Sequence, residues 1–251
     1  MLISSKPGLS RGGPACCWTV TWLSAMRAAR DRIVLMNEGS CSSPTSVRYA
    51  DRTLSAYDRH AKRAIANWGR ARTPSMLLQP FIRTLAPSSL VLDYGCGIGT
   101  DLAWMRRRGV RAEGLDGTLA FVLEARRRCP GVPVRHERFE TVRLPAHAYD
   151  AIWCNAALLH VPPGELRRQL RMLRRALRPE GWLGVTLAWG RARTYTRRDW
   201  IPDRYCAGYS KAQGAALFSQ WLVRELRVVS NTGRQGRWIW VMARATTPAA
   251  S

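Results

Sequence analysis

The sequence predicts an α/β fold with a doubly wound, mostly parallel sheet of seven strands whose last strand is antiparallel. Apolar runs of strand length alternate with amphipathic helical patterns from position 89 onward, as in repeated strand–helix–strand units. Hydrophobic residues make up 46% of the 251-residue chain, which is enough for a core. The last two apolar runs have only residues 231–236 between them, a length that suits a hairpin and is too short for a parallel crossover.

Two helices are expected before the alternation begins. Residues 53–68 place apolar side chains such as Leu54, Tyr57 and Ile65 at helical spacing, and a second, shorter helix is expected over 75–85. The strands are then expected at 89–93, 111–116, 132–139, 151–155, 182–189, 225–230 and 237–243. The helices between them are expected at 100–108, 119–128, 163–177 and 211–223, the third of which opens with prolines in its first turn.

Residues 1–45 differ in composition from the rest of the chain. They are rich in Ser, Gly, Pro and Cys and show no sustained period, so we expect a poorly ordered N-terminal extension. Met36 stands where a shorter chain would begin, which makes residues 1–35 a candidate for an over-extended start. Residues 46–245 are expected to form a single domain, and residues 246–251 a tail.

One apolar stretch in the N-terminal region resembles the core of a signal peptide. Residues 15–26 follow Lys6 and Arg11, but their Thr, Ser and Trp side chains make them weakly apolar, and no clear cleavage site follows. No run approaches the roughly 20 apolar residues that span a bilayer. The seven cysteines are irregularly spaced and lack a C-x-x-C pair, so we expect reduced thiols, no metal site and a cytoplasmic protein without a membrane partner.

The formal net charge of +23 comes almost entirely from arginine. Such a balance is typical of proteins that bind nucleic acid, anionic lipid or acidic substrates, but it also arises from arginines spread over solvated surfaces. The arginine triplets at 106–108 and 126–128 lie near the ends of expected helices, where cations suit the helix dipole. No basic stripe is interleaved with aromatic residues, so we favour a small-molecule partner and keep nucleic acid as the alternative.

A glycine loop follows the first strand of the alternation. Its glycines are Gly95, Gly97 and Gly99, and a dinucleotide fingerprint would require another at position 100, where the chain has Thr. Asp93 stands two residues before the first glycine. In an open α/β sheet this strand tip borders the ligand, and a carboxylate there suits a cation better than two phosphates.

The next strand also ends in an acid. Asp116 lies 17 residues beyond Gly99, where a carboxylate can accept both hydroxyl groups of a ribose. The alternative is that Asp116 caps the helix that follows it.

Together with the motifs below, these residues make the chain resemble class I S-adenosylmethionine-dependent methyltransferases, and the resemblance covers about residues 49–245. V-L-D-Y-G-C-G-I-G-T-D-L at 91–102 is similar to the first motif of the family, and G-L-D-G-T at 114–118 to the second. Y-D-A-I-W-C-N-A-A-L-L-H-V-P at 149–162 and L-R-R-A-L-R-P-E-G-W-L at 173–183 resemble the motifs around the fourth and fifth strands. Y-D-R-H-A at 57–61 resembles the small bacterial group described as tellurite-resistance-like or general small-molecule methyltransferases.

The resemblance implies a Rossmann-like methyltransferase fold with strand order 3-2-1-4-5-7-6, and S-adenosylmethionine as the cofactor. It places the cofactor against Asp93, Gly95, Gly97, Gly99, Asp116, Phe139 and Asn155, with Phe139 near the adenine. Two departures stand out: Arg138 occupies a position where many relatives carry an acid, and T-L-A-W-G at 186–190 replaces a frequent S-F-K-x-G pattern. The adenine contact and the acceptor side are therefore expected to differ from those of relatives.

Methyl transfer from a sulfonium is an in-line displacement, so positioning supplies much of the rate and a base matters only if the acceptor arrives protonated. His160, after the fourth strand, is the candidate base, with a packing or capping role as its alternative. Acceptor contacts are predicted for Tyr57, His60, Trp189 and Tyr205, with packing or solvent exposure as the alternative for each. We expect methyl transfer to a small molecule; the alternatives are an RNA methyltransferase and a non-catalytic binding protein on the same scaffold.

Overall fold

The computed structural model describes residues 44–70, 75–190, 193–197, 200–230 and 236–246. All of them belong to one compact unit, residues 42–251. The predicted extension at 1–45 lies outside the described residues except for its last two positions, and so does the predicted tail after residue 246. The start at Met36 and the apolar stretch at 15–26 also fall outside them.

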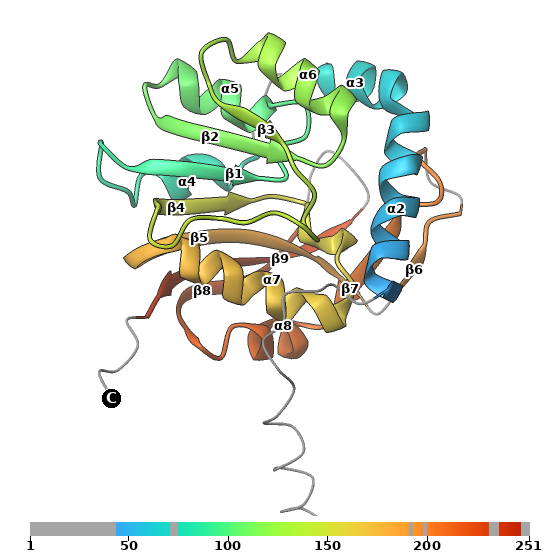
Figure 1. Ribbon diagram of the computed structural model, residues 1–251. Coiled ribbons are helices and arrows are strands. Elements are labelled where there is room, and N and C mark those ends of the chain that lie inside the picture. The colour runs from blue at the N-terminus through green and yellow to red at the C-terminus, as the bar shows by residue number, and fades with distance from the viewer. Residues whose placement is uncertain (1–43, 71–74, 191–192, 198–199, 231–235, 247–251) are drawn as a thin grey trace, which may run out of the picture. The chain divides into compact units, whose positions relative to one another are not determined.

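One continuous sheet forms the centre of this unit (Figure 1). Its strands are β1 (Leu90–Tyr94), β2 (Arg111–Asp116), β3 (Val134–His136), β4 (Tyr149–Cys154), β5 (Leu177–Trp189), β6 (Arg193–Tyr195), β7 (Tyr205–Tyr209), β8 (Trp221–Ser230) and β9 (Arg237–Ala245). The seven predicted strands run in the order β3-β2-β1-β4-β5-β9-β8, with β9 antiparallel to both neighbours. This confirms the predicted fold class and the antiparallel last strand.

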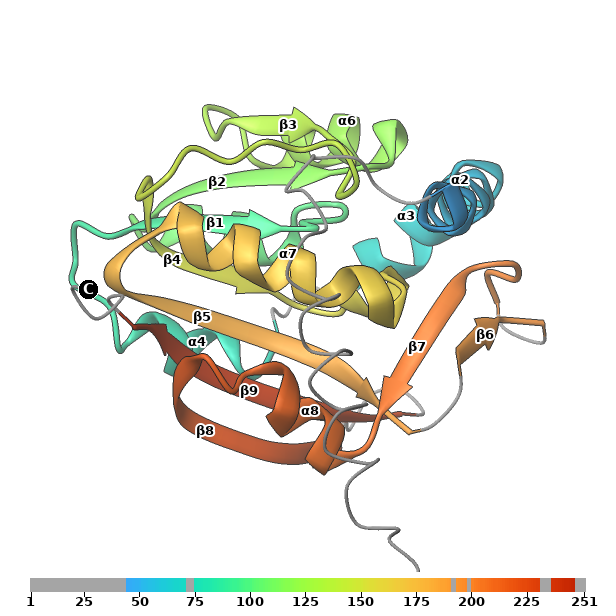
Figure 2. The same ribbon diagram turned by 60° about the horizontal axis from the view of Figure 1, so that its bottom comes forward.

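Helices cover both faces of the sheet and one of its ends. They are α2 (Pro44–Arg59), α3 (Ala61–Gly69), α4 (Leu78–Ile82), α5 (Thr100–Arg107), α6 (Leu119–Arg128), the 3₁₀ turn η1 (Leu158–His160), α7 (Pro163–Ala176) and α8 (Lys211–Leu217). The apolar face of α7 packs into one core cluster, and α4, α5 and α6 pack into another on the opposite face (Figure 2). Both faces of the parallel strands are therefore buried, which explains why these strands read as continuous apolar runs.

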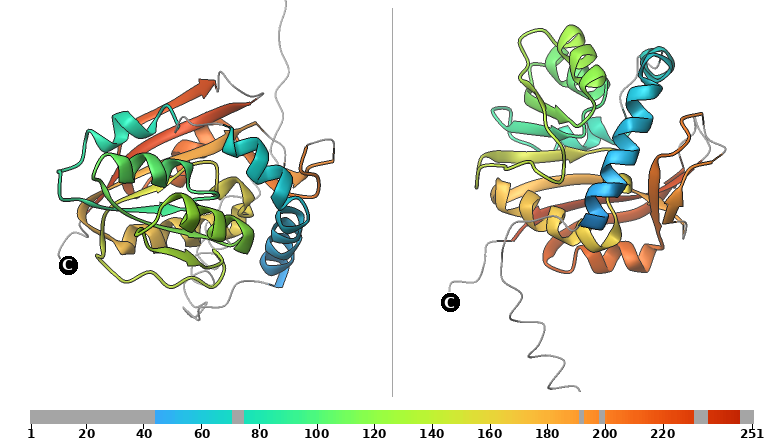
Figure 3. Two further views of the ribbon diagram at one scale, coloured as in Figure 1. Left: turned by 90° about the horizontal axis from the view of Figure 1, so that it is seen from above. Right: turned by 45° about the vertical axis from the view of Figure 1, so that its right-hand side comes forward.

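The N-terminal helix predicted at 53–68 is two helices. His60 interrupts it with a non-helical backbone (φ −110°, ψ 14°), and α3 starts at the next residue. Figures 1 and 3 show α2 across the end of the sheet where β1 and β4 finish, beside β6 and β7. The inner side of this pair, including Tyr57 and Ala64, packs with Ile98 of the glycine loop, so the two helices cover that loop.

Strand pairing changed the predicted boundaries near the C-terminus. The helix expected at 211–223 ends at Leu217, because Trp221 to Val223 pair with Ala243 to Ala245 as the start of β8. The helix has a complete capping box at Ser210 and Gln213, so its start follows the local sequence while its end does not. Pairing of β8 with β9 overrode the local helical pattern.

The hairpin of β6 and β7 was not predicted. Its second strand runs parallel to the last two residues of β5 and antiparallel to β6, so it extends the sheet beside α2. Among the described helices none is long and apolar enough to cross a membrane.

Candidate functional site

The glycine loop turns sharply at the carboxyl end of β1. All three glycines have positive φ values (83°, 53° and 77°), which side chains other than glycine rarely adopt. A Cβ on Gly95 would lie 2.4 Å from the Cβ of Ala157, so the segment after β4 presses directly on the loop. A Cβ on Gly97 would meet no described atom within 4 Å, so the loop backbone borders open space there.

Asp93 is buried at the tip of β1, with only 2% of its surface exposed. Its Oδ2 atom has no hydrogen-bond partner among the described residues. Burial raises the pKa of this carboxyl well above its ordinary value, and the nearby Asp101 and Asp116 raise it further. An unsatisfied buried acid costs stability, so its environment is one that a cationic hydrogen-bond donor would relieve.

Asp116 ends β2 and ties the glycine loop to the start of α6. Its Oδ2 accepts from the Gly97 amide at 2.9 Å, and its Oδ1 accepts from the Thr118 amide at 2.8 Å. Thr118, and not Asp116, occupies the N-cap position of α6. Burial raises the pKa of Asp116 despite these two hydrogen bonds and a further one from the Thr118 side chain. The two carboxylate oxygens together offer about four acceptor positions, so the carboxylate keeps capacity to accept another hydrogen bond.

Asp101, in the first turn of α5, is an acid that our sequence interpretation missed. Its Oδ2 accepts from the indole Nε1 of Trp153 at 2.8 Å, and its Oδ1 accepts from the Ser75 amide at 3.0 Å. Asn155 donates more weakly to the same Oδ2 (3.4 Å) and accepts from the Thr186 hydroxyl at 3.0 Å. The acid directly after the glycine loop was the signal that could have revealed this contact.

Phe139 lies beside the glycine loop, where a Cβ on Gly95 would come within 3.1 Å of its ring. Its ring stacks on Tyr94 with the centroids 4.5 Å apart. Gln169 of α7 fixes both residues, because it accepts from the Tyr94 hydroxyl at 2.7 Å and donates to the Phe139 carbonyl at 2.6 Å. Arg138, at the position where many relatives carry an acid, forms an ion pair with Asp51 of α2 at 2.5 Å. It therefore helps to hold the helix that covers the loop.

A chain of hydrogen bonds joins three segments of the chain around His160. The Nδ1 atom lies 2.6 Å from the backbone carbonyl of Tyr205, and Nε2 lies 2.8 Å from the Tyr57 hydroxyl. Arg204 donates to the same hydroxyl at 3.0 Å. Burial raises the pKa of Tyr57 to about 12, and the Arg204 cation partly offsets this rise. Tyr57 and His160 were predicted site residues, whereas Arg204 was not.

The other predicted acceptor contacts lie elsewhere. The buried ring of Tyr205 packs against Tyr49 with centroids 4.5 Å apart, and its backbone carbonyl lies 2.6 Å from His160 Nδ1. Trp189 is 43% exposed and carries the Arg237 guanidinium 4.2 Å from its ring centroid. His60 marks the break between α2 and α3. The structure therefore brings Tyr57 and His160 together but places these three outside that contact.

The described residues include no cluster of three or more His, Cys, Asp or Glu side chains suited to a metal ion.

Comparison with known proteins fits this arrangement. Residues 91–181 match the family described as a methyltransferase domain. The matched segment runs from β1 to the first part of β5 and contains the glycine loop, Asp116 and His160. The motifs that the sequence interpretation placed in class I methyltransferases therefore coincide with this domain, and the match supports a methyltransferase.

Two curated relatives match part of this chain. The methyltransferase GfsG of Streptomyces halstedii is 29% identical over 102 residues, which are 38% of this chain and 36% of that protein. An uncharacterised methyltransferase of Mycobacterium tuberculosis is 34% identical over 97 residues, which are 38% of this chain and 48% of that protein. The alignments thus span between a third and a half of the relatives' own length.

Solved methyltransferase structures share the fold. An N1-methyltransferase of Burkholderia thailandensis, solved with 1,6-didemethyltoxoflavin and S-adenosylhomocysteine, superimposes with a TM-score of 0.64 at 18% identity. The superposition covers 84% of this chain and 94% of that one. The Rossmann-like methyltransferase fold therefore extends well beyond the 91 to 181 segment.

Proposed function

We propose that this protein transfers the methyl group of S-adenosylmethionine to a small-molecule acceptor by in-line displacement. The observation that carries the proposal is the carboxyl edge of the sheet. There the open backbone at Gly97, the Asp93 Oδ2 that has no partner within the described part of the chain, and the remaining acceptor capacity of Asp116 lie around one loop. Together they suit a ligand that carries an ammonium group, a ribose and a positive charge.

The residues present fit this cofactor. Asp93 would accept from its amino group, Asp116 from its ribose hydroxyls, and Phe139 would border its adenine. When bound, the cofactor supplies a methyl group on a sulfonium, which needs no further activation. The protein then has to position the acceptor and exclude water, and α2 and α3, packed onto Ile98, provide that cover.

A small acceptor fits the covered site better than a large one. Tyr57, Trp68 and Phe121 form an aromatic cluster under α2 and α3, with ring centroids 5.2–6.1 Å apart. The motifs of the tellurite-resistance-like group support the same substrate class. The net charge of +23 is the observation that favours RNA instead, and RNA binding that weakens steeply with salt would support that alternative.

Binding of S-adenosylmethionine, measured by calorimetry, tests the proposed cofactor site. Gly97→Asn is the sharpest variant, because asparagine tolerates a positive φ while its side chain fills the open space. We expect at least about a 10-fold loss of affinity, since the variant forfeits contacts worth more than about 1.4 kcal/mol. Gly109→Asn is the matched control, because Gly109 also has a positive φ (71°) and open space but lies after α5.

Equal loss in both variants, or no loss in either, would contradict the assignment. Transfer of a labelled methyl group into a small-molecule extract, followed by mass analysis of the product, then tests catalysis. Binding without any transfer would favour a non-catalytic protein on this scaffold.

A further inference from the structure

The hydrogen bonds around His160 determine which side chain can accept a proton from the methyl acceptor. A carbonyl oxygen only accepts, so His160 Nδ1 must carry a proton and donate it to the Tyr205 carbonyl. In the neutral ring Nε2 is then an acceptor, and it receives the Tyr57 hydroxyl proton at 2.8 Å. Both ring nitrogens of His160 are therefore engaged by protein atoms.

Among the residues that the structure describes, one hydrogen-bonding position of the Tyr57 hydroxyl has no partner. A phenol oxygen has one proton and two lone pairs. The proton goes to His160 Nε2, and one lone pair accepts from Arg204 Nη1 at 3.0 Å. The remaining lone pair can accept one hydrogen bond, which gives Tyr57, and not His160, the capacity to receive a proton from a bound molecule.

This cluster lies at the same edge as the glycine loop. Ala157, three residues before His160, presses on Gly95, and Tyr57 packs in one cluster with Ile98. The Tyr57 ring meets Phe121 at 5.3 Å and Trp68 at 6.1 Å between centroids. The Tyr57 ring thus belongs to an aromatic cluster that packs on the loop, and an aromatic acceptor is the class of compound that such a lining favours.

We propose that Tyr57 is the acceptor-facing catalytic residue, that His160 and Arg204 position it, and that the acceptor is a small aromatic compound methylated on a hydroxyl oxygen. This inference rests on the proposed function. The acceptor oxygen forms a bond to the methyl carbon as the carbon–sulfur bond breaks, and the electron pair of that bond stays on sulfur. The acceptor proton passes to the Tyr57 oxygen while the Tyr57 proton passes to His160 Nε2, which leaves a neutral phenol and an imidazolium.

The proton transfer through Tyr57 restricts the class of acceptor and gives Arg204 its role. A relay is needed only for an acceptor that arrives protonated, which excludes carboxylates and thioethers. Phenolic acceptors match the acidity of a tyrosine relay more closely than aliphatic alcohols do. Arg204 stabilises negative charge on the Tyr57 oxygen during the transfer. The other titratable groups that act on this hydroxyl are Cys206 and Asp116, which both raise the pKa of Tyr57.

The first test uses the protein without cofactor. The ring nitrogens of His160, observed by nitrogen NMR in the whole protein, should show a proton on Nδ1 and a hydrogen-bonded, unprotonated Nε2. Tyr57→Phe keeps the ring packing but removes the hydroxyl, so the Nε2 resonance should shift while Nδ1 stays protonated. Tyr49→Phe, the same substitution on the same helix, should leave both resonances in place. An Nε2 signal unaffected by Tyr57→Phe would overturn the relay.

The second test measures transfer of a tritium-labelled methyl group from S-adenosylmethionine to a panel of phenols and to a small-molecule extract. Tyr57→Phe and His160→Gln should each lower kcat by about 100-fold or more, as loss of general base catalysis does. Arg204→Lys should retain more activity than Arg204→Gln. S-adenosylhomocysteine affinity should stay within about twofold of the parent protein in all four variants, and Tyr49→Phe should retain full activity.

The outcomes separate the two proposals. Failure of the parent protein to bind S-adenosylhomocysteine would refute the proposed function. Binding with transfer to carbon, sulfur or a carboxylate, or an unchanged rate and pH profile in Tyr57→Phe, would refute only the relay. Binding without any transfer would refute both catalytic proposals.

Discussion

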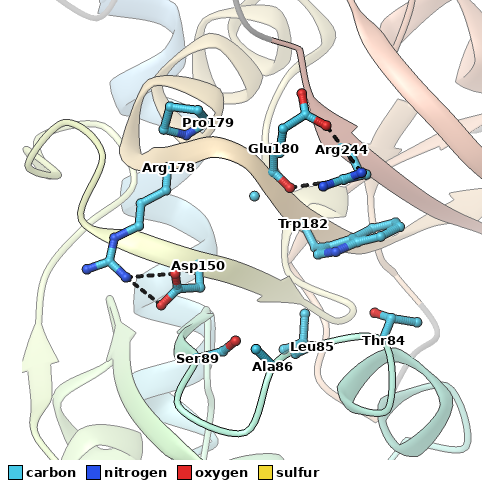
Figure 4. Close-up of a pocket in the computed structure, with 11 residues that line it drawn as sticks. Thr84, Leu85, Ala86, Ser89, Asp150, Arg178, Pro179, Glu180, Trp182 and Arg244 are labelled. Carbon is cyan, nitrogen blue, oxygen red and sulfur yellow. Dashed lines mark hydrogen bonds and ion pairs between the residues drawn. The ribbon is translucent and has the colours of Figure 1, made fainter.

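Acidic residues at the two ends of the central strands differ in whether an arginine pairs with them. At the carboxyl ends, Asp93 is buried with Oδ2 unpaired among the described residues. At the amino ends, a hollow of about 200 Å³ is bordered by acids that are paired: Asp150 with Arg178 at 2.7 Å, and Glu180 with Arg244 at 3.2 Å (Figure 4).

This difference indicates that the acids of the amino edge stabilise the fold and that the acid of the carboxyl edge binds a ligand. At the amino edge each acid is paired with an arginine, and these ion pairs join the first residues of β5 to β4 and β9. At the carboxyl edge the buried Oδ2 of Asp93 has no partner among the described residues, which costs folding free energy and is retained where a ligand supplies the missing group. The charged side chains around the amino-edge hollow therefore do not make it the better candidate for the cofactor.

The largest expected effect is a loss of S-adenosylmethionine affinity when Asp116, but not Asp150, is replaced. Both acids accept from a backbone amide, Asp116 from Gly97 and Asp150 from Leu90. Asp116→Ala should weaken S-adenosylmethionine binding by about 100-fold, because hydrogen bonds from ribose to a charged group are worth about 1.5–3 kcal/mol. Asp150→Ala should lower the free energy of unfolding but leave the affinity unchanged. Calorimetry of both variants measures the affinity, and urea melts measure the free energy of unfolding. Equal affinity in the two variants would contradict the assignment of cofactor binding to the carboxyl edge.

A second prediction concerns the acid at the tip of β1. The folded state raises the pKa of Asp93 above its unfolded value, so the folded state binds more protons and stability falls as pH rises above the unfolded pKa. Asp93→Asn removes that penalty, and we expect it to raise the free energy of unfolding at pH 8 by about 1 kcal/mol, the scale of one buried unsatisfied group. The gain should shrink at pH 5.

The same variant should bind S-adenosylmethionine more weakly, since the amide carries no charge to pair with an ammonium group. In the parent protein affinity should rise with pH, because a cation favours the carboxylate form, and binding should release protons. Calorimetry in buffers of different ionisation enthalpy measures that release. A variant that is less stable than its parent at pH 8 would contradict this account of Asp93.

The smallest expected effect lies at the amino edge. Glu180 has a φ of 62°, in the left-handed region that favours glycine. Glu180→Gly should relieve that strain but lose the ion pair with Arg244, for a net gain of about 0.5 kcal/mol in thermal or urea unfolding. Cofactor affinity should not change. A loss of stability would show that the ion pair outweighs the strain.

Local patterns predicted the parts of the site that depend on chain-neighbour geometry. The glycine loop and the acids at two strand ends follow from short motifs, whereas the order of the central strands was implied by the family resemblance. Contacts between distant segments were harder. Asp101 reads as an ordinary first-turn acid, and only the fold brings the Trp153 indole to it. Arg204 is one arginine among many until β7 places it 3.0 Å from Tyr57.

The sequence alone determined the fold class and the place of the glycine loop, because the spacing of apolar residues and glycines acts through the backbone of neighbouring residues. Tertiary structure decided the end of α8, the break at His60 and the β6–β7 hairpin, since strand pairing and burial override local propensity. It also decided the hydrogen-bond partners of His160. Tyr57 and Tyr205 come from two segments far apart in the sequence, and hydrogen-bond geometry between them and His160 exists only after the chain has folded.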